Sequence, residues 1–200
     1  MSYWALEIGE GVLTVFLQNE ELLATSHQQG VVPAAVRNAF ENALAQHVFF
    51  KLATTDGLTV LTEHQELSDL LVWSWVPIFS ERGRGLAAEL GCTTQEFVPC
   101  QFETNPGEMH YMHLPARSYD VVDLDQSTFL MKIPVDPPIP FHTQFLVMRA
   151  FSGPLPPLFR VPAPGGKQVL GDLFVSDEFK LSWEERGFTG AQFRKLDCPL

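Results

Sequence analysis

The stretch Phe174-Val175-Ser176-Asp177 has a counterpart earlier in the chain, Ile78-Phe79-Ser80-Glu81. The segments that these stretches open, residues 78–100 and 174–196, align without a gap. Five identical pairs carry the match: Ser80 with Ser176, Glu89 with Glu185, Gly91 with Gly187, Thr93 with Thr189, and Phe97 with Phe193. The sequence therefore predicts an internal repeat.

Each copy of the repeat has the residues that start and stop a helix. An apolar strand leads to a serine, Ser80 or Ser176, which is a preferred N-cap, and an acidic residue follows in the first turn. Further along, Gly91 or Gly187 stands where helices commonly end. The repeat therefore predicts a strand, a helix and a strand in both places. It carries no recurring nucleophile, base or metal ligand, so it indicates framework.

The composition indicates a folded protein and excludes several functional classes. The 200 residues are 46% hydrophobic and 18% charged, which is typical of a globular chain. The formal net charge of −11 repels nucleic acid and anionic lipid, and it favours basic partners. The N-terminus has no basic segment followed by a long apolar run, and no apolar window approaches the roughly 18 residues of a membrane span. We therefore expect a cytoplasmic protein without a membrane or nucleic-acid partner.

The three cysteines, Cys92, Cys100 and Cys198, argue against a disulfide scaffold and against a zinc ribbon. They form no CxxC pair and no even set, which are the usual signs of those frameworks. We therefore expect free thiols in a reducing compartment, with no metal and no other cofactor.

The first 65 residues predict a ββαββ-like lobe. Residues 3–17 alternate around Gly9-Glu10-Gly11, as in a hairpin. Pro33 begins a segment with apolar residues at helical spacing. Asp56-Gly57 between two apolar runs is a strong signal for a second hairpin.

Residues 66–200 are expected to form a second domain that contains both repeat copies. A short helical stretch near residues 63–70 and an aromatic strand at Leu71–Val76 lead into the first copy. Asn105-Pro106-Gly107 is expected to form the turn after this copy.

Further strands are expected at residues 119–133 and 144–151. Proline-rich segments connect them, so these connections are expected to be stiff and extended. The predicted fold class is α+β, with a few helices packed on mainly antiparallel sheets.

The string Gly83-Arg84-Gly85-Leu86-Ala87-Ala88 offers an enzyme-like alternative. It has the GxGxxA spacing of a dinucleotide-binding loop, follows an apolar strand, and precedes Glu103 by about twenty residues. The second repeat copy has Phe179, Leu181 and Glu184 where the two glycines and the last alanine stand, although it keeps the helix signals. We therefore expect both glycines to lie in a helix, and nucleotide binding stays the alternative.

His110 and His113 have the HxxH spacing of a metal-binding pair. In a strand, residues three apart point to opposite faces, so one ion cannot reach both side chains without distortion. The neighbouring Met109, Tyr111 and Met112 favour packing. We therefore predict no metal site here.

The acidic segment from Asp120 to Ser127 offers a second enzyme-like alternative. Asp123 and Asp125 would share one face of a strand, with Ser127 as a nucleophile. No histidine or lysine has a spacing that would activate them, and such segments commonly form turns and caps. We therefore expect structural roles and no catalytic residue.

Trp183 is a candidate for partner binding, because the first copy has an alanine in its place and Glu184 and Glu185 follow it. An exposed aromatic ring surrounded by acids is typical of a binding hot spot for a basic partner. Asp177 and Glu178 at the start of the same helix complete the predicted partner-binding set. Burial of Trp183 in the core is the alternative.

Several stretches of the sequence form a recognisable series. They are residues 119–127 (YDVVDLDQS), Pro157-Leu158-Phe159-Arg160, Leu173 to Phe179, and Gly187 to Phe193. Together with Phe79 to Pro99, this series resembles immunity protein family 11 of bacterial polymorphic toxin systems, over about residues 70–197. Residues 1–65 contribute nothing to the resemblance.

The resemblance implies a protein that binds and neutralises a toxin encoded beside it, without catalysis. The acidic charge favours a basic toxin domain such as a nuclease, blocked at its active site or substrate groove. The alternative is a small-molecule enzyme or nucleotide-binding protein that uses Gly83–Ala88 or Asp120–Ser127. That alternative predicts a deep pocket at one of these segments.

Overall fold

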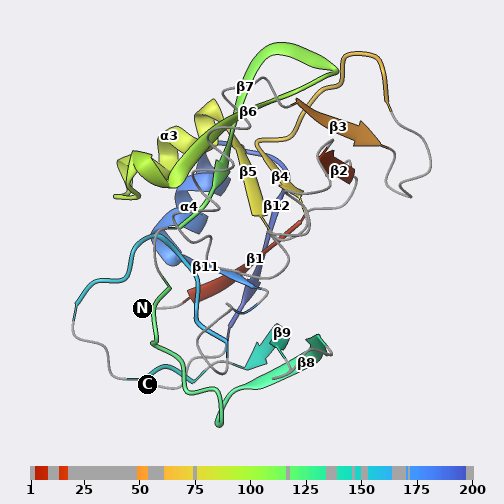
Figure 1. The fold of residues 1–200 in the computed structure, drawn as a ribbon. Coiled ribbons are helices and arrows are strands. Elements are labelled where there is room, and N and C mark those ends of the chain that lie inside the picture. The colour runs from red at the N-terminus through yellow and green to blue at the C-terminus, as the bar shows by residue number, and fades with distance from the viewer. Residues whose placement is uncertain are drawn as a thin grey trace.

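The described residues form three sheets, and the two larger sheets meet beside a pair of helices (Figure 1). The computed structural model describes residues 3–8, 14–17, 49–53, 61–73, 76–115, 118–133, 139–145, 147–149, 153–163, 170 and 172–196. Within these residues the architecture is α+β with mainly antiparallel sheets, which confirms the fold class predicted from the sequence.

The larger sheet contains six strands. They are β2 (Thr14–Leu17), β3 (Phe49–Ala53), β4 (Leu70–Trp73), β5 (Val76–Ser80), β6 (Phe97–Phe102) and β7 (Asn105–His113). Their order across the sheet is β2-β3-β6-β7-β5-β4, and neighbours are antiparallel except β3 and β6, which run parallel. Helix α3 (Glu81–Glu89) and the short 3-10 helix η1 (Thr94–Glu96) connect β5 to β6.

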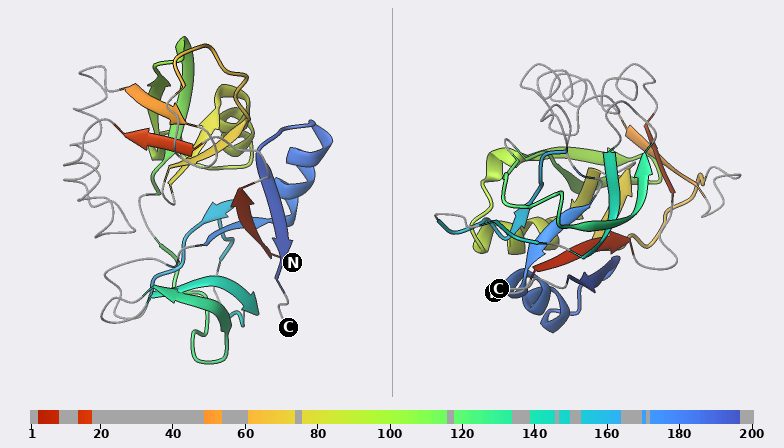
Figure 2. Two further views of the ribbon diagram at one scale, coloured as in Figure 1. Left: turned by 90° about the vertical axis from the view of Figure 1, so that its right-hand side faces the viewer. Right: turned by 90° about the horizontal axis from the view of Figure 1, so that it is seen from below.

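The smaller sheet contains four antiparallel strands. They are β1 (Tyr3–Ile8), β10 (Leu158–Phe159), β11 (Leu173–Ser176) and β12 (Ala191–Lys195), in the order β10-β11-β1-β12. Helix α4 (Asp177–Glu185) connects β11 to β12. A separate hairpin of β8 (Thr128–Ile133) and β9 (Ile139–Phe145) lies away from both helices (Figure 2).

Both matching sequence segments contain a strand, a helix and a strand in this order, and the first has η1 in addition. In the first, β5 and β6 flank β7, which is antiparallel to both; in the second, β11 and β12 flank β1 in the same way. In each sheet, the two strands of the segment are therefore separated by a third strand, which comes from outside the segment. For the second segment that third strand comes from the N-terminal end of the sequence.

Both helices begin and end at the residues that the sequence predicts. Ser80 Oγ accepts a hydrogen bond from the Gly83 amide at 3.1 Å, and Ser176 Oγ accepts one from the Phe179 amide at 3.2 Å. Each serine is thus an N-cap, which satisfies an amide that the helix leaves without an internal partner. The glycine after each helix has a positive φ, as helix C-termini often require.

One hydrophobic cluster lies between the two larger sheets and the two helices. The two helices lie next to each other (Figures 1 and 2). Its buried members are Leu70, Phe79, Leu86, Ala87, Cys92, Phe97, Leu158, Leu173, Val175, Phe179 and Trp183. Leu173 and Val175 belong to this cluster, while Phe174 between them belongs to a second cluster on the other face of β11. The smaller sheet is therefore buried on both faces.

Asp69, just before β4, joins the two segments through a buried carboxylate that is 5% exposed. Its Oδ1 accepts hydrogen bonds from Ser80 Oγ at 2.7 Å and from Arg82 Nε at 3.1 Å. Its Oδ2 accepts them from Arg82 Nη2 at 2.7 Å and from the Thr189 amide at 3.0 Å. One carboxylate thus contacts the cap of α3 and the loop that follows α4.

The electrostatics of Asp69 follow from these contacts. Burial by itself raises the pKa of this carboxyl, but hydrogen bonds from Arg82, Ser80 and Thr189, with the charge of Arg82, hold the pKa below its usual value. Asp69 is therefore a carboxylate in the folded protein at neutral pH.

Gly190 brings the loop after α4 against the start of β4. The Leu70 amide donates to the carbonyl of Thr189 at 3.1 Å, and a Cβ on Gly190 would lie 2.2 Å from the Leu70 carbonyl oxygen. Gly190 also has a φ of +88°, which other residues rarely adopt. Only glycine fits this contact between the segments.

Gly83 has a similar role on α3. A Cβ at this position would lie 3.2 Å from the Asp69 carbonyl oxygen, from a ring carbon of Phe79 and from a ring carbon of Trp183. The missing side chain lets α3 approach both β4 and the ring on α4.

The hairpin predicted for residues 3–17 is wrong. Strand β1 pairs with β11 and β12 in the smaller sheet, while β2 pairs with β3 in the larger one. The reason is burial on both faces, since Ala5 and Tyr3 pack on one cluster and Trp4 and Leu6 on the other. A central position in a sheet provides this, whereas a local hairpin does not.

Further local predictions also differ from the structure: β8 begins only at Thr128 of the strand expected at residues 119–133, and β9 covers Ile139–Phe145 where a strand was expected at residues 144–151. Residues 61–69 contain no helix, and the single strand expected at Leu71–Val76 is the antiparallel pair β4 and β5, with Trp73 opposite Val76. The turn expected at residues 105–107 lies two residues earlier, because Phe102 pairs with Asn105 and β7 begins there.

Parts of the predicted N-terminal lobe lie outside the described residues. These are the helix beginning at Pro33 and the Asp56-Gly57 turn. The division of the chain at residue 65 stays a prediction, although strands from both sides of it share each sheet.

Replacing Gly190 with alanine is expected to destabilise the fold by more than about 2 kcal/mol, because the new Cβ meets the Leu70 carbonyl and the positive φ is strained. The control is Gly85→Ala, since nothing lies within 4 Å of a Cβ there, and a helical alanine should stabilise by about 0.5–1 kcal/mol. Urea unfolding measures both. Equal effects of the two substitutions would contradict the close contact at Gly190.

Replacing Asp69 with asparagine is expected to cost roughly 2–3 kcal/mol at pH 7, because several donors lose a charged acceptor. The folded-state pKa of Asp69 is lowered, so its contribution is present above about pH 4 and is lost as the pH falls. The difference between wild type and variant should therefore shrink between about pH 5 and pH 2. The control is Asp120→Asn, an exposed partner of Arg149, with a cost below about 1 kcal/mol. A pH-independent difference would contradict the assignment.

Candidate partner-binding surface and neighbouring pocket

The acidic residues predicted to bind a partner lie at the two ends of α4. Glu178 in the first turn and Glu184 and Glu185 in the last turn are exposed. Asp177 is half-buried, and its Oδ1 accepts a hydrogen bond from Trp4 Nε1 at 2.6 Å. Three of the four carboxylates are therefore accessible to a partner, and the fourth joins α4 to β1.

The expected exposure of Trp183 is wrong, because its side chain is 1% exposed. The ring stacks on Phe179 at a centroid distance of 5.6 Å and meets Phe188 edge-on at 5.1 Å. Gly83 on α3 leaves the space that the ring occupies. Trp183 therefore belongs to the core that both helices share, which was the alternative.

The exposed apolar side chain on α4 is Leu181, which is 53% exposed. The sequence analysis did not single it out, although helical spacing contained the signal. Phe179 and Trp183 are four residues apart and share the inner face, so Leu181 between them points outward.

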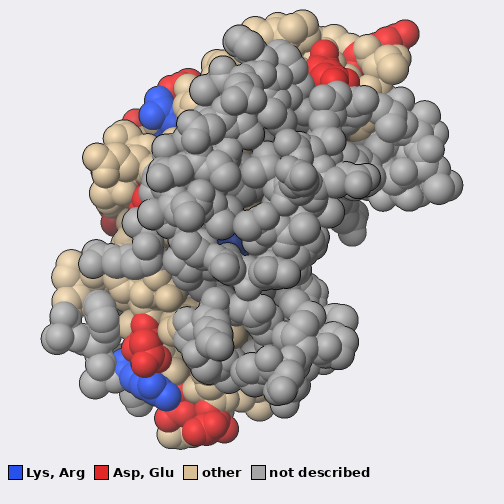
Figure 3. Space-filling view, in the orientation of Figure 1, with Lys and Arg blue, Asp and Glu red and all other residues tan. Residues whose placement is uncertain are grey.

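Basic side chains lie among these acids, so the helical surface carries both signs. Lys180 Nζ lies 2.5 Å from Glu184, and Arg186, the C-cap of α4, lies 2.5 Å from Glu89 of α3. Figure 3 shows acidic and basic side chains beside each other at the α3 edge of the molecule. The Arg186–Glu89 pair is exposed on both sides, and such pairs contribute little to stability.

A pocket of about 520 Å³ opens beside the C-terminal end of α3. Its walls are residues 90–93 after the helix, Gln95 and Glu96 of η1, and the proline-rich residues 154–158, with Pro115 and Tyr119. This volume lies in the range of small-ligand sites.

The described lining residues of the pocket include one acid, Glu96, and one thiol, Cys92. Burial raises the pKa of Cys92 to about 12, and the charge of Glu96 contributes to the rise. Cys92 is therefore a neutral thiol and a poor nucleophile. Behind the wall, the buried His113 Nε2 lies 3.7 Å from Glu96 Oε2.

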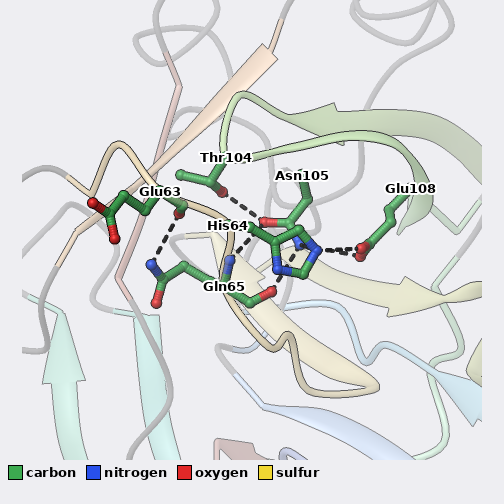
Figure 4. Close-up of polar contacts among 6 residues, drawn as sticks. All are labelled: Glu63, His64, Gln65, Thr104, Asn105 and Glu108. Carbon is green, nitrogen blue, oxygen red and sulfur yellow. Dashed lines mark hydrogen bonds and ion pairs between the residues drawn. The ribbon is translucent and has the colours of Figure 1, made fainter.

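A polar cluster lies where the tip of the β6–β7 hairpin meets the segment before β4 (Figure 4). Buried Asn105 donates from Nδ2 to the Gln65 carbonyl at 2.8 Å and to Glu108 Oε2 at 3.1 Å. Its Oδ1 accepts from Thr104 Oγ1 at 2.7 Å. These contacts attach residues 61–69 to the hairpin.

His64 completes this cluster from the segment before β4. Its Nε2 lies 2.8 Å from Glu108 Oε1 and 3.2 Å from Asn105 Nδ2. The hydrogen bond with His64 is the main cause that lowers the pKa of the Glu108 carboxyl. Because both side chains are exposed, their pairing contributes little to stability.

The structure does not support a dinucleotide-binding loop at Gly83–Ala88. Gly83 and Gly85 both lie inside α3, and Ser80 already accepts from the Gly83 amide. The first turn of this helix is therefore capped by the protein itself, and the glycines form no phosphate-binding loop.

The acidic segment has the structural roles expected of it, although not on a strand. Asp123 Oδ1 accepts from the amides of Asp125 and Gln126, and residues 124–126 form a turn. Ser127 Oγ donates to the Asp123 carbonyl at 2.6 Å and accepts from the Val147 amide at 3.0 Å. The expectation that Asp123 and Asp125 share a strand face is therefore wrong.

His110 and His113 pack on different aromatic rings. His110 is 4% exposed and lies 5.1 Å from the Phe102 ring, while His113 lies 5.0 Å from the Phe97 ring. Burial is the main cause that lowers the pKa of His110. Among the described residues, no group of three histidines, cysteines or acids has the geometry to hold a metal ion.

Comparisons with known proteins add no relative: no protein-family model matches the sequence, and no curated protein matches it. None of the helices described by the structure has the length and apolar character needed to cross a membrane.

Cys92 is expected to react slowly with iodoacetamide at neutral pH, because a thiol with a pKa of about 12 is thiolate at a fraction on the order of 10⁻⁴ or less. Peptide-level mass spectrometry should find labelling at least about a hundredfold slower in the native than in the urea-unfolded chain, and faster at higher pH. Equal rates in the two states would indicate an activated cysteine in this pocket.

Proposed function

We propose that this chain is an immunity protein of the family-11 kind, which binds a cognate bacterial toxin and neutralises it without catalysis. The carrying observation is the outer surface of α4, where Glu178, Glu184 and Glu185 are exposed together with Leu181. An apolar side chain among carboxylates suits a basic protein partner. The net charge of −11 supports the same class of partner.

The roles of the matched residues are consistent with this proposal. In the stretch from Leu173 to Phe179, Ser176 caps α4 and Phe179 is buried. In the stretch from Gly187 to Phe193, Thr189 and Gly190 attach the loop to Asp69 and β4. The residues that carry the resemblance thus build a framework, and recognition is left to side chains on its surface.

The proposed mechanism is occlusion of a basic active site or substrate groove, as on a nuclease toxin. An acidic surface increases the rate of association with a basic partner through long-range attraction. Once the complex has formed, Leu181 would be removed from water, which slows dissociation.

The direct test mixes the purified chain with the product of the neighbouring gene. The proposal expects a stoichiometric complex by size-exclusion chromatography and rescue of growth in cells that express the toxin. No complex and no rescue would refute it. Turnover of a small molecule by the chain alone would favour the enzyme alternative.

Charge reversal of Glu184 and Glu185 to lysine is expected to slow association with a basic toxin by at least about tenfold at low salt, and to reduce the salt dependence of the association rate. Surface plasmon resonance at several salt concentrations measures both effects.

The matched control is Glu63→Lys with Glu66→Lys, which changes the net charge equally at two exposed acids before β4. Circular dichroism checks that both double variants remain folded. Equal slowing by the two pairs would show that overall charge matters and that α4 is not the binding surface.

A further inference from the structure

The pocket beside the end of α3 has a chemistry that the proposed function does not use. Among its described lining residues Glu96 is the charged one and none is basic, while the buried His113 Nε2 lies 3.7 Å from Glu96 Oε2 behind the wall. The side chain of Glu96 is 18% exposed, so solvent screens its charge less than that of the acids on α4.

The end of helix α3 adds to the negative potential. The helix finishes at Glu89, which is paired with Arg186, and its C-cap is Leu90; the last turn itself contains no basic residue. Carbonyl groups at a helix C-terminus carry a partial negative charge that attracts cations. Leu90 and Gly91 themselves line the pocket, so this end of the helix forms part of its wall.

The remaining walls suit the stem of a long cationic side chain. Pro154, Pro156, Pro157 and Leu155 present apolar surface, against which methylene groups pack favourably. The half-buried Tyr119 adds an aromatic ring, and a cation near the face of such a ring is attracted to it. A single pocket therefore combines apolar walls, an aromatic ring and a carboxylate.

We propose that this pocket binds the arginine or lysine side chain of a basic protein partner, with Glu96 as the anion that the cation contacts. The identity of that partner as a toxin rests on the function proposed above, whereas binding of the cationic side chain does not. The occupant follows from charge complementarity: the walls offer negative charge and apolar surface, and an arginine or lysine combines a cation with an apolar stem.

The test uses N-acetyl-arginine N-methylamide, which mimics an arginine within a protein chain. Titrated into the ¹⁵N-labelled protein, it should shift the amide signals of Gly91, Thr93 and Glu96. The citrulline analogue has the same shape without the charge, and it should bind roughly tenfold more weakly. Equal binding of the two probes, or shifts confined to other surfaces, would overturn the proposal.

Variants of the pocket locate the interaction. Glu96→Gln should weaken probe binding roughly tenfold, while Glu89→Gln, an exposed acid at the end of the same helix, should leave it unchanged. Thr93→Arg places a positive charge at an exposed lining position and should abolish binding, and Gln95→Glu should strengthen it. These exposed substitutions test the proposal even if Glu96→Gln does not fold. Probe binding that is unchanged by both Thr93→Arg and Gln95→Glu would overturn the proposal.

Two further arms separate the possible outcomes. Free arginine that binds more tightly than the blocked derivative would show a small-molecule site and overturn the assignment to a protein side chain. Failure of the chain to bind the toxin while the blocked probe still binds would refute the proposed function and leave the pocket assignment standing. A toxin complex unaffected by Thr93→Arg would place the pocket outside the binding interface and overturn its assignment to this partner.

Discussion

The arrangement of the two strand-helix-strand segments depends on the buried carboxylate of Asp69. A buried charge is tolerated when hydrogen-bond donors surround it, and here they come from Ser80 and Arg82 of one segment and Thr189 of the other. Removing the hydrogen-bond donors of either segment would leave the buried carboxylate with fewer hydrogen bonds to offset the cost of its burial. The carboxylate therefore fixes the position of α3 relative to the loop that follows α4, and Gly190 allows the close approach that this position requires.

The same arrangement decides which side chains remain for recognition. Because α3 approaches α4 closely at Gly83, the Trp183 ring fills the space between the helices and is removed from the surface. The outer face of α4 keeps its carboxylates and Leu181, and the end of α3 forms a wall of the pocket that contains Glu96. The chemistry available to a partner is thus a consequence of helix packing, since packing determines which face of each helix is buried.

Local signals in the sequence predicted the helices well and the sheets less well. Serine caps and terminal glycines act on amides and carbonyls only a few residues away. These helix signals can therefore be recognised in the sequence without knowledge of the fold. The hairpin expected at residues 3–17 failed because β1 completes a sheet with strands from the far end of the chain. Alternating apolar residues indicate a strand but do not identify its neighbours. For the candidate site, the acids of α4 were predicted from the sequence, and Leu181 was missed although its spacing from Phe179 and Trp183 carried the signal. The pocket was not predictable, because its walls come from segments distant in sequence.

By itself, the sequence determined the α+β class, the boundaries of the two helices and the acidic character of the molecule. These properties depend on composition and on contacts between near neighbours. Only the tertiary structure decided that Asp69 joins the segments, that Trp183 is buried and that Glu96 lies in a pocket. Each of these requires residues distant in sequence to meet, and their meeting depends on how the two sheets and two helices bury their apolar faces together.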